Sequence, residues 1–413
     1  MRKKVVVTGM GVISPIGNSI EEYWQSLLNG KSGVDYIKSF DTEMFDTKFA
    51  AEVKNFEVTD YLDRKEARRM DLFTQYALVA ADFAVKNSGL NLEKENLDRI
   101  GVILGTGIGG MQTYHHNFKK LIDFGPKKIS PFFIPMMIPD IAPGHISMRF
   151  GFKGPNYTVV SACASSTHAI GTALRLIRYG DVDVMVTGGT EATVTEICVG
   201  GFNSMRALST RNENPQKASR PFEANRDGFV IGEGSGILIL ESEEHAIKRG
   251  AKIYAEVGGA GATADAYHIT APSPDGDGAI RVMKMAIEDA GLTVNDVDYI
   301  NAHGTSTPHN DRTETLAIKT LFGDRAKEIA VSSTKSMIGH LLGASGSLEL
   351  IASVLSIVND KIHPTVNYET PDPDCDLNYT PNNAIDKTVN VAISNSFGFG
   401  GHNGCVLVKK YDK

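Results

Sequence analysis

The sequence predicts an α/β protein with buried sheets, built from two similar halves. Runs rich in β-branched residues, among them KKVVVTG, IGVILGT, VDVMVTGG and VNVAISNS, alternate along the chain with segments of helical periodicity. The plan of residues 158–184 returns in residues 330–360, since each stretch has a strand, a turn rich in small residues, and a long helix. A repeated plan of this kind predicts a duplicated unit.

Two further pairs of segments extend the duplication. The run IGVILGTGIGG (100–110) corresponds to VDYINAHGTSTP (297–308), and VDVMVTGGTEA (182–192) corresponds to VNVAISNSFGFGG (389–401). The charged segment EHAIKRGAKIYAE (244–256) is the best internal boundary, so we expect an N-terminal half over residues 1–250 and a C-terminal half over 251–413. Equivalent loops of the halves should meet at the ends of their strands, where α/β proteins usually form their sites.

The composition argues against several classes of protein. Of the 413 residues, 42% are hydrophobic, which allows a large core, and the net charge of −7 argues against a general binder of nucleic acid or anionic membranes. The opening MRKKVVVTGMG is typical of a strand and not of a signal peptide, and no apolar run is long enough for a membrane span. Four cysteines lie far apart, without a CxxC pair or a histidine cluster, so we expect no disulfide framework, no metal site and a cytoplasmic location.

Cys163 lies where a strand turns into a helix. Val159 ends the strand-like run, and Ile170, Leu174 and Ile177 follow at helical spacing. A cysteine near a helix N-terminus feels unpaired N–H groups that favour the thiolate, which is the nucleophilic form. The alternative is a buried cysteine that acts as a small hydrophobe.

The equivalent loops of the second half carry histidines. His303 lies in NAHGTSTP (301–308), and His340 lies among glycines in STKSMIGHLLGASG (333–346). Lys335 shares the second loop, and Glu349 is its expected partner in a buried ion pair. The alternative for each histidine is a surface residue or a hydrogen-bonded core residue.

A further strand-end loop, NSFGFGGHN (395–403), places glycines around Phe397 and Phe399. Glycine gives the backbone conformations closed to other residues, so we expect a movable aromatic lid.

A rival motif, GTGIGG (105–110), has the glycine spacing of a dinucleotide-binding loop. That fingerprint also needs an acidic residue at the end of the next strand, and the corresponding region reads FGPKKISPFF, without such a strand. We therefore do not expect a nicotinamide cofactor.

Four segments together resemble the thiolase-fold condensing enzymes, in particular the β-ketoacyl-acyl-carrier-protein synthase II group. They are SACASS, RPFEANRDGFVIGEGSG, NAHGTSTPHND and SSTKSMIGHLLGASG, and the likeness runs over essentially the whole chain. The resemblance implies a homodimer of duplicated α/β halves with a layered αβαβα architecture.

The resemblance also implies a reaction. Cys163 would accept an acyl chain from acyl carrier protein, and His303 and His340 would bind malonyl-acyl carrier protein and promote loss of CO₂. The resulting carbanion would attack the thioester and give a β-ketoacyl product two carbons longer, in type II fatty-acid synthesis. No cofactor is expected on the chain, because 4′-phosphopantetheine enters on the carrier protein.

Further roles are implied by position. Backbone N–H groups of Cys163 and Phe399 would form an oxyanion hole, and Lys335 with Glu349 would hold the network around the histidines. Pantetheine contacts are expected from Thr305 and Thr307, and substrate or acyl-pocket contacts from Ile108, Phe133, Phe202 and Phe397. The expected docking residues for the acidic carrier protein are Lys65, Arg68, Arg69, Lys127, Lys128 and Arg206, for which the alternative is a solvated surface.

Related activities fit the residues less well. Thiolases use a second cysteine as base, and Cys375 and Cys405 do not lie in a comparable loop. Initiating synthases have asparagine where His340 stands. A stand-alone polyketide ketosynthase and a catalytically silent chain-length partner subunit remain alternatives, the second disfavoured by the intact cysteine.

Overall fold

The computed structural model describes residues 2–412, and ten strands form its main sheet. Their order across the sheet is β10-β9-β13-β14-β8-β1-β7-β6-β4-β5. The strands of the first half are β1 (Val5–Ile13), β4 (Ile100–Gly105), β5 (Asn156–Val159), β6 (Val184–Glu191) and β7 (Gly234–Ser242). Those of the second half are β8 (Ala255–Ala264), β9 (Tyr299–Asn301), β10 (Ala330–Ser332), β13 (Val391–Gly398) and β14 (His402–Lys409).

The two halves of the sheet have the same topology. In the first half β1 is antiparallel to β7, β7 is antiparallel to β6, and β6, β4 and β5 are parallel. The second half repeats this pattern with β8, β14, β13, β9 and β10. The halves join where β1 pairs with β8. This confirms the predicted duplication, including each pair of segments matched in the sequence.

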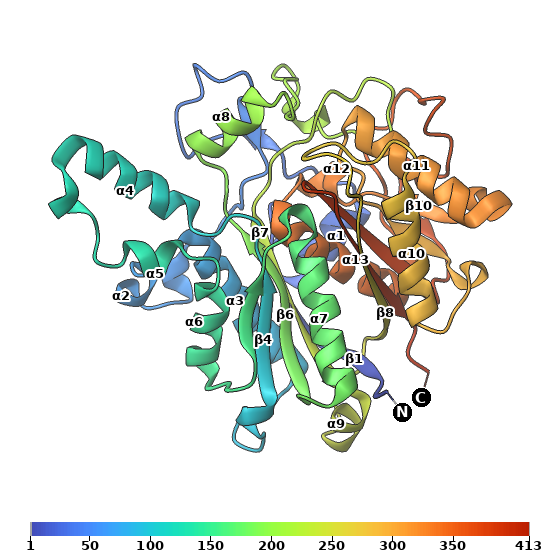
Figure 1. Cartoon of the computed structure of the whole chain (residues 1–413), viewed down its shortest axis with the longest axis horizontal. Helices are drawn as coiled ribbons and strands as arrows, with labels where there is room; N and C mark the ends of the chain where they lie inside the picture. The colour runs from blue at the N-terminus through green and yellow to red at the C-terminus, as the bar shows by residue number, and fades with distance from the viewer. Residues whose placement is uncertain (1, 413) are drawn as a thin grey trace.

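Helices form the other layers (Figure 1). Two central helices, α7 (Ser165–Tyr179) and α13 (Ser345–Asn359), contact strands of both halves. The outer helices are α3 (Leu72–Ser88) and α6 (Ile141–Phe150) on the first half, and α10 (Asp277–Asp289) and α11 (Pro308–Phe322) on the second. Three apolar cores lie between these layers, one around the central helices and one beneath each outer pair. The layered αβαβα fold is therefore confirmed.

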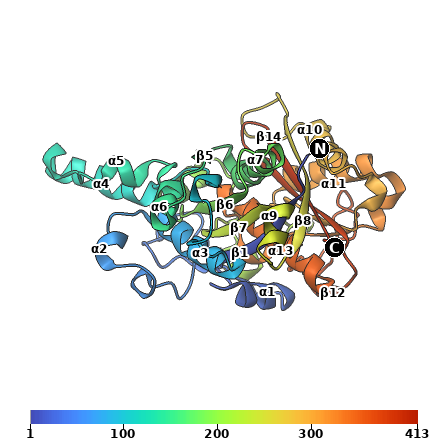
Figure 2. The ribbon, with the colours of Figure 1, turned by 90° about the horizontal axis from the view of Figure 1, so that it is seen from below.

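The remaining elements are short or peripheral. They are α1 (Ile20–Leu28), β2 (Asp35–Tyr36), β3 (Phe49–Ala50), α2 (Arg64–Ala67), α4 (Met111–Phe124), α5 (Phe133–Met137), α8 (Glu196–Ser204), α9 (Glu243–Lys248), α12 (Lys335–Ile338), β11 (Lys361–Ile362) and β12 (Ile385–Asp386). Helices α4 and α5 project as an arm, which Figures 1 and 2 both show at one end of the molecule. The expected boundary at residue 250 falls between α9 and β8.

One stretch, Leu342–Asn359, is long and apolar enough to cross a membrane by composition alone. It includes α13, and 89% of it is buried inside the protein. No continuous apolar run was expected from the sequence because serine, glycine and Glu349 interrupt the apolar residues of this stretch. The stretch packs as the core helix of this fold.

Close packing of α3 on β1 gives a prediction for stability. A Cβ on Gly11 would lie 2.0 Å from the Ala80 carbonyl oxygen, so Gly11→Ala must push the helix away. We expect a loss of about 1–3 kcal/mol in the free energy of unfolding, seen as a lower unfolding temperature by circular dichroism. The control is Gly144→Ala in α6, where a Cβ meets open space and a gain of about 0.5–1 kcal/mol is expected. Equal stability of the two variants would contradict this packing.

Candidate active site

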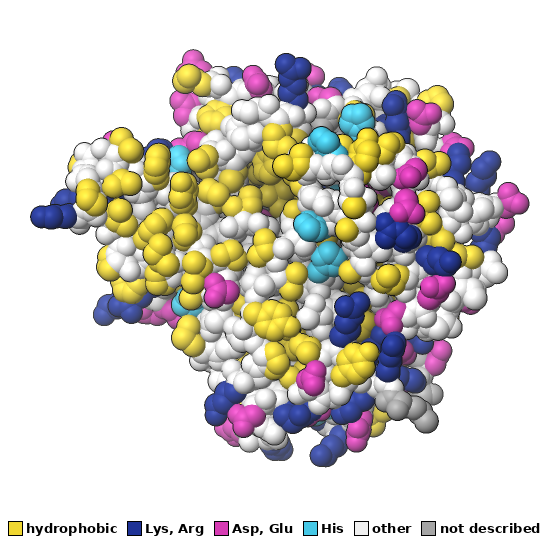
Figure 3. Space-filling model, viewed as in Figure 1, with side chains coloured by type: hydrophobic (Ala, Val, Ile, Leu, Met, Phe, Trp, Pro, Cys, Tyr) yellow, Lys and Arg dark blue, Asp and Glu magenta, His cyan; other side chains and the backbone are white. Residues whose placement is uncertain are grey.

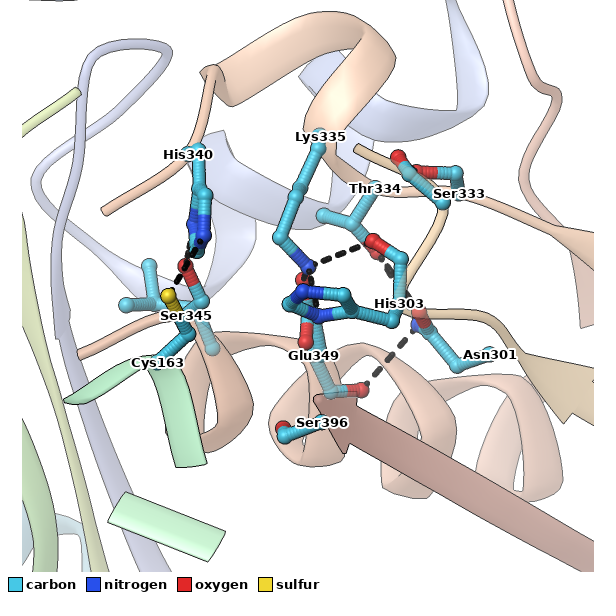
Figure 4. Close-up of polar contacts among 12 residues, drawn as sticks. Cys163, Asn301, His303, Ser333, Thr334, Lys335, His340, Ser345, Glu349 and Ser396 are labelled. Atoms are coloured by element: carbon cyan, nitrogen blue, oxygen red, sulfur yellow. Dashed lines mark hydrogen bonds and ion pairs between the residues drawn. The ribbon is translucent and has the colours of Figure 1, made fainter. Parts of the chain in front are cut away.

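Three side chains from separate loops converge in one place. Cys163 lies in the 3₁₀ turn η4 (Ala162–Ala164) before α7, His340 precedes the turn η8 (Leu342–Ala344) before α13, and His303 follows β9. Cys163 Sγ is 3.1 Å from His340 Nε2, and ligand atoms of all three residues lie within 4.8 Å of one another. The side chains are buried, and Figure 4 shows Cys163 and His340 turned toward each other.

Glycines let the starts of α7 and α13 come this close. A Cβ on Gly343 would lie 2.2 Å from the backbone nitrogen of Gly107, and one on Gly346 would lie 2.0 Å from Thr167 Oγ1. A larger residue at Gly346 would therefore push the two helix starts apart, and one at Gly343 would push the start of α13 away from the loop that follows β4.

Lys335 and Glu349 form a buried ion pair beside His303 (Figure 4). The exposed fractions of their side chains are 1% and 0%. Lys335 Nζ also donates to the His303 carbonyl oxygen at 2.7 Å and lies 3.3 Å from His303 Nδ1. Because an unpaired buried charge is costly, each partner requires the other, and together they fix the position of His303.

Both histidines are neutral at neutral pH. Burial lowers the pKa of His303 and of His340 well below the ordinary value, and the charge of Lys335 acts in the same direction on both. A neutral imidazole has one N–H donor and one acceptor nitrogen. Each ring can thus donate or accept a hydrogen bond at the site without carrying charge.

The environment of Cys163 corrects the expectation of a ready thiolate. Burial raises the pKa of the Cys163 thiol to about 12, against the opposing effects of Lys335 and of the Phe399 backbone N–H. A position at a helix start would by itself lower the pKa of Cys163, but the loss of solvent around the sulfur has the larger effect and raises it. The resting residue is a thiol whose sulfur faces Nε2 of His340.

The loop between β13 and β14 closes one side of the site. The backbone N–H groups of Phe399 and Cys163 lower the pKa of Cys163, and such donors suit the oxygen of an acyl group. Gly400 has a φ of 83°, which favours glycine. The ring of Phe397 meets that of His303 edge-on, with centroids 5.6 Å apart.

A cavity of about 520 Å³ opens over Cys163 and the two histidines. Most of the expected substrate residues line it, namely Ile108, Phe202, Thr305, Thr307 and Phe397. Phe399, expected in the oxyanion hole, and Arg206, expected in carrier docking, line it as well. Phe133 is not among the lining residues. It begins α5 on the projecting arm, where its ring lies 6.5 Å from that of Tyr114.

The other expected docking residues are exposed on two segments. Helix α2 ends at Ala67, so it is shorter than the helical face expected for Lys65, Arg68 and Arg69. The basic residues of the arm, Lys127 and Lys128, lie in the 3₁₀ turn η3 (Pro126–Lys128). The guanidinium of Arg69 lies 5.0 Å over the ring of Phe132, which links the first segment to the arm.

Sequence reasoning missed three residues around the site. The buried Glu191 carboxylate accepts from the backbone N–H groups of Gly107 and Gly343, at 2.6 and 2.9 Å, and so ties loops of both halves behind Cys163. The ring of Phe229 meets the His340 ring edge-on at 5.3 Å. Ser345 Oγ lies 2.9 Å from His340 Nδ1. An acidic residue ending the apolar strand VDVMVTGGTE was the one available signal.

The cysteine and two histidines form a donor set that zinc accepts. The ammonium of Lys335, 3.3 Å from His303 Nδ1, opposes a second cation at this place. The geometry therefore favours nucleophilic chemistry over metal binding.

The raised pKa of Cys163 predicts how the thiol reacts with iodoacetamide. Only the thiolate is alkylated, so the rate should rise about ten-fold per pH unit from about pH 8 to about pH 11. Mass spectrometry of the Cys163 peptide measures the rate, with Cys163→Ala as the blank. A rate already level near pH 8 would show that the helix start, and not burial, dominates.

Comparison with known proteins identifies the family. Residues 2–246 match the model of the beta-ketoacyl synthase N-terminal domain, and residues 254–369 match that of the C-terminal domain. The 3-oxoacyl-[acyl-carrier-protein] synthase 2 of Staphylococcus aureus (strain COL) is 54% identical over 410 residues, covering 99% of both chains. Its namesake from Synechocystis sp. is 53% identical with the same coverage.

Solved structures of ketosynthases have the same fold as this chain. A chain of the AntDE:AntF complex, described as a type II PKS acyl-carrier protein with its ketosynthase bound to the hexaketide, has a TM-score of 0.93 at 36% identity and full coverage of both chains, 100% each. A beta-ketoacyl synthase from Burkholderia phymatum STM815 has a TM-score of 0.92 at 34% identity, covering 99% of this chain and 100% of that one. On its fold, its site and these relatives, the chain belongs to the beta-ketoacyl synthase family.

Proposed function

We propose that this protein is a condensing enzyme of the acyltransferase class that joins an acyl chain on Cys163 to malonyl-acyl carrier protein. The reaction releases CO₂ and elongates a fatty acid by two carbons. The observation that carries the proposal is a cysteine sulfur 3.1 Å from a neutral histidine, with a second histidine beside it, beneath an open cavity. Full-length relatives named 3-oxoacyl-[acyl-carrier-protein] synthase 2, at 53–54% identity, support it.

The first half-reaction loads the enzyme. Cys163 Sγ attacks the thioester carbonyl of the acyl carrier protein, while the N–H groups of Cys163 and Phe399 hold the carbonyl oxygen. The bond from sulfur to the acyl carbon forms and the pantetheine thiolate leaves. The thiol proton passes through His340 to the leaving sulfur, because His340 Nε2 is the ring nitrogen next to Sγ.

The second half-reaction builds the new bond. Loss of CO₂ from the malonyl thioester places negative charge on its carbonyl oxygen, and N–H donors of His303 and His340 stabilise the enolate there. The carbanion attacks the acyl-Cys163 thioester, and the tetrahedral intermediate collapses to the β-ketoacyl product with cleavage of the bond between the acyl carbon and sulfur. The departing Cys163 thiolate takes a proton from water, which restores the thiol. Two neutral rings suit this role, since their lowered pKa keeps them from acting as fixed cations.

The cavity suits a pantetheine arm. Thr305 and Thr307 line it, and their hydroxyl groups lie 2.9 Å apart. In this proposal the chain itself carries no cofactor and no metal, and 4′-phosphopantetheine arrives on the carrier protein. A cytoplasmic location is part of the proposal, supported by four unpaired cysteine thiols.

Two alternatives fit less well. A polyketide ketosynthase is supported by the solved type II PKS ketosynthase at 36% identity, which is lower than the 53–54% identity to the 3-oxoacyl-[acyl-carrier-protein] synthases 2. A silent chain-length partner is disfavoured by the assembled Cys163, His303 and His340.

We also propose that the protein forms a homodimer through β5. This strand ends the sheet with one edge free; Tyr157 within it and Val160 directly after it are 40% and 56% exposed. Figure 3 shows apolar side chains gathered over the neighbouring arm, where Ile122 and Phe124 are 70% and 68% exposed. A free edge and an apolar face of this kind fit pairing with β5 of a second copy.

Variants of the cysteine and the histidine should separate the two half-reactions. Cys163→Ala should abolish acyl transfer and condensation yet leave decarboxylation of malonyl-acyl carrier protein measurable. His303→Ala should slow decarboxylation by about 10²–10³, the effect of losing one oxyanion donor, while the cysteine is still acylated. The release of CO₂ measures the rate of decarboxylation, and the increase in the mass of the enzyme measures the rate of acylation. Condensation by Cys163→Ala at the parent rate would refute the assignment.

Charge reversal tests carrier docking. Acyl carrier proteins are strongly acidic, so Lys65→Glu with Arg68→Glu should raise KM for carrier-bound substrates about ten-fold, and added salt should raise KM in the parent. A small pantetheine thioester should be turned over as before.

The matched control reverses Lys248 and Lys252 to glutamate, two exposed lysines at and just beyond the end of α9. An equal loss of turnover of the carrier-bound and the small substrate by the Lys65→Glu, Arg68→Glu variant would indicate damaged folding. An unchanged KM for the carrier-bound substrate would place docking elsewhere.

A further inference from the structure

The two histidines differ in the group that meets Nδ1. His303 Nδ1 lies 3.3 Å from Lys335 Nζ, and His340 Nδ1 lies 2.9 Å from Ser345 Oγ. An ammonium group only donates hydrogen bonds, whereas a hydroxyl group both donates and accepts. The Nδ1 partner decides which nitrogen of a neutral imidazole carries the proton. Lys335 therefore fixes His303 with its proton on Nε2, and Ser345 is compatible with either form of His340.

The duplicated half shows that Ser345 departs from the repeated pattern. Ser165 begins α7 as Ser345 begins α13. Its hydroxyl donates to the Ala162 carbonyl oxygen at 2.7 Å and accepts from the Ser161 N–H at 2.9 Å, so its orientation is set. Within residues 2–412, His340 is the one hydrogen-bond partner recorded for the Ser345 hydroxyl, which is fully buried. No hydrogen bond other than the one with His340 therefore sets the orientation of this hydroxyl.

The two half-reactions require opposite protonation states of His340 Nε2. To take the proton of Cys163, 3.1 Å away, Nε2 needs a lone pair, and the ring proton is then on Nδ1. To donate to the enolate oxygen, Nε2 needs the proton, and Nδ1 is then an acceptor. A partner that only donated would block the first form.

We propose that Ser345 is a positioning residue that lets His340 change tautomer between the two half-reactions, while Lys335 keeps His303 a permanent Nε2–H donor. This inference rests on the proposed function. In acyl transfer, Nδ1–H donates to Ser345 Oγ, and Nε2 takes the thiol proton and returns it to the leaving pantetheine sulfur. Between the half-reactions, the His340 ring exchanges protons with solvent, losing the one on Nδ1 and gaining one on Nε2, so no net charge develops. Ser345 O–H then donates to Nδ1.

The direct test is nitrogen NMR of the full-length protein labelled with ¹⁵N-histidine. His303→Gln and His340→Gln assign the resonances. We expect Nδ1 of His303 to be unprotonated throughout, and Nδ1 of His340 to be partly protonated in the resting enzyme and unprotonated once Cys163 is acylated. A single His340 tautomer with Nδ1 unprotonated in the resting enzyme would overturn the proposal. This readout needs no turnover, so it stands even if the wild-type enzyme never acylates and the proposed function fails.

Partial reactions give a second test. In Ser345→Ala an Nδ1–H would have no acceptor, and an unpaired buried N–H is less tolerated than an unpaired acceptor, so His340 should stay an Nε2–H donor. Acylation of Cys163 by acyl-acyl carrier protein should then slow about ten-fold, the size of one lost hydrogen bond. Decarboxylation by enzyme already acylated should stay within about two-fold.

Ser345→Thr, which keeps the hydroxyl, should restore acylation. Ser356→Ala is the matched control, because its buried hydroxyl donates to the Ala352 carbonyl oxygen of the same helix, away from the site. Equal slowing of both steps, or of neither, by Ser345→Ala would overturn the proposal. If the Ser345 variants do not fold, the resting tautomer of the wild-type protein decides.

Discussion

The close contact between the starts of α7 and α13 is the constraint on which the site depends. Helix α7 directly follows the turn that carries Cys163 in the first half, and α13 follows the His340 loop of the second half. The backbone N–H of Ser347 donates to Ser166 Oγ at 3.1 Å across the contact, and Gly346 leaves no space for a side chain. Because the two starts touch, Cys163 and His340 are within hydrogen-bond distance without any long side chain reaching across.

Burial at this contact also sets the protonation states. The same loss of solvent that raises the pKa of Cys163 lowers that of both histidines, so the resting site holds a thiol and two neutral rings. The one ion pair beside them, between Lys335 and Glu349, is internal to the second half. The site therefore holds no preformed thiolate, and the Cys163 thiol must lose its proton during the reaction. The hydrogen-bond partners of the histidine ring nitrogens decide which nitrogen can accept or donate that proton.

Local sequence patterns predicted the fold and most of the site. The repeated plan around residues 158–184 and 330–360 predicted the topology, because strand, turn and helix are each legible in a short window. His303 and His340 stood out because small residues around them left no packing role. The shift of the Cys163 pKa could not be predicted this way, since a helix start is local while burial depends on both halves. The partners Ser345 and Glu191 were missed for the same reason, and the position of Phe133 depends on the direction of an arm.

The central claim is that Cys163 is the acyl acceptor of a condensing enzyme. The most direct measurement is mass spectrometry of the intact protein and its peptides after incubation with acyl-acyl carrier protein, without the malonyl substrate. The account predicts one acyl group per chain, on the peptide that contains Cys163 and released by hydroxylamine. A folded protein that gains no acyl group, or gains it on the neighbouring buried Cys198, would contradict the account.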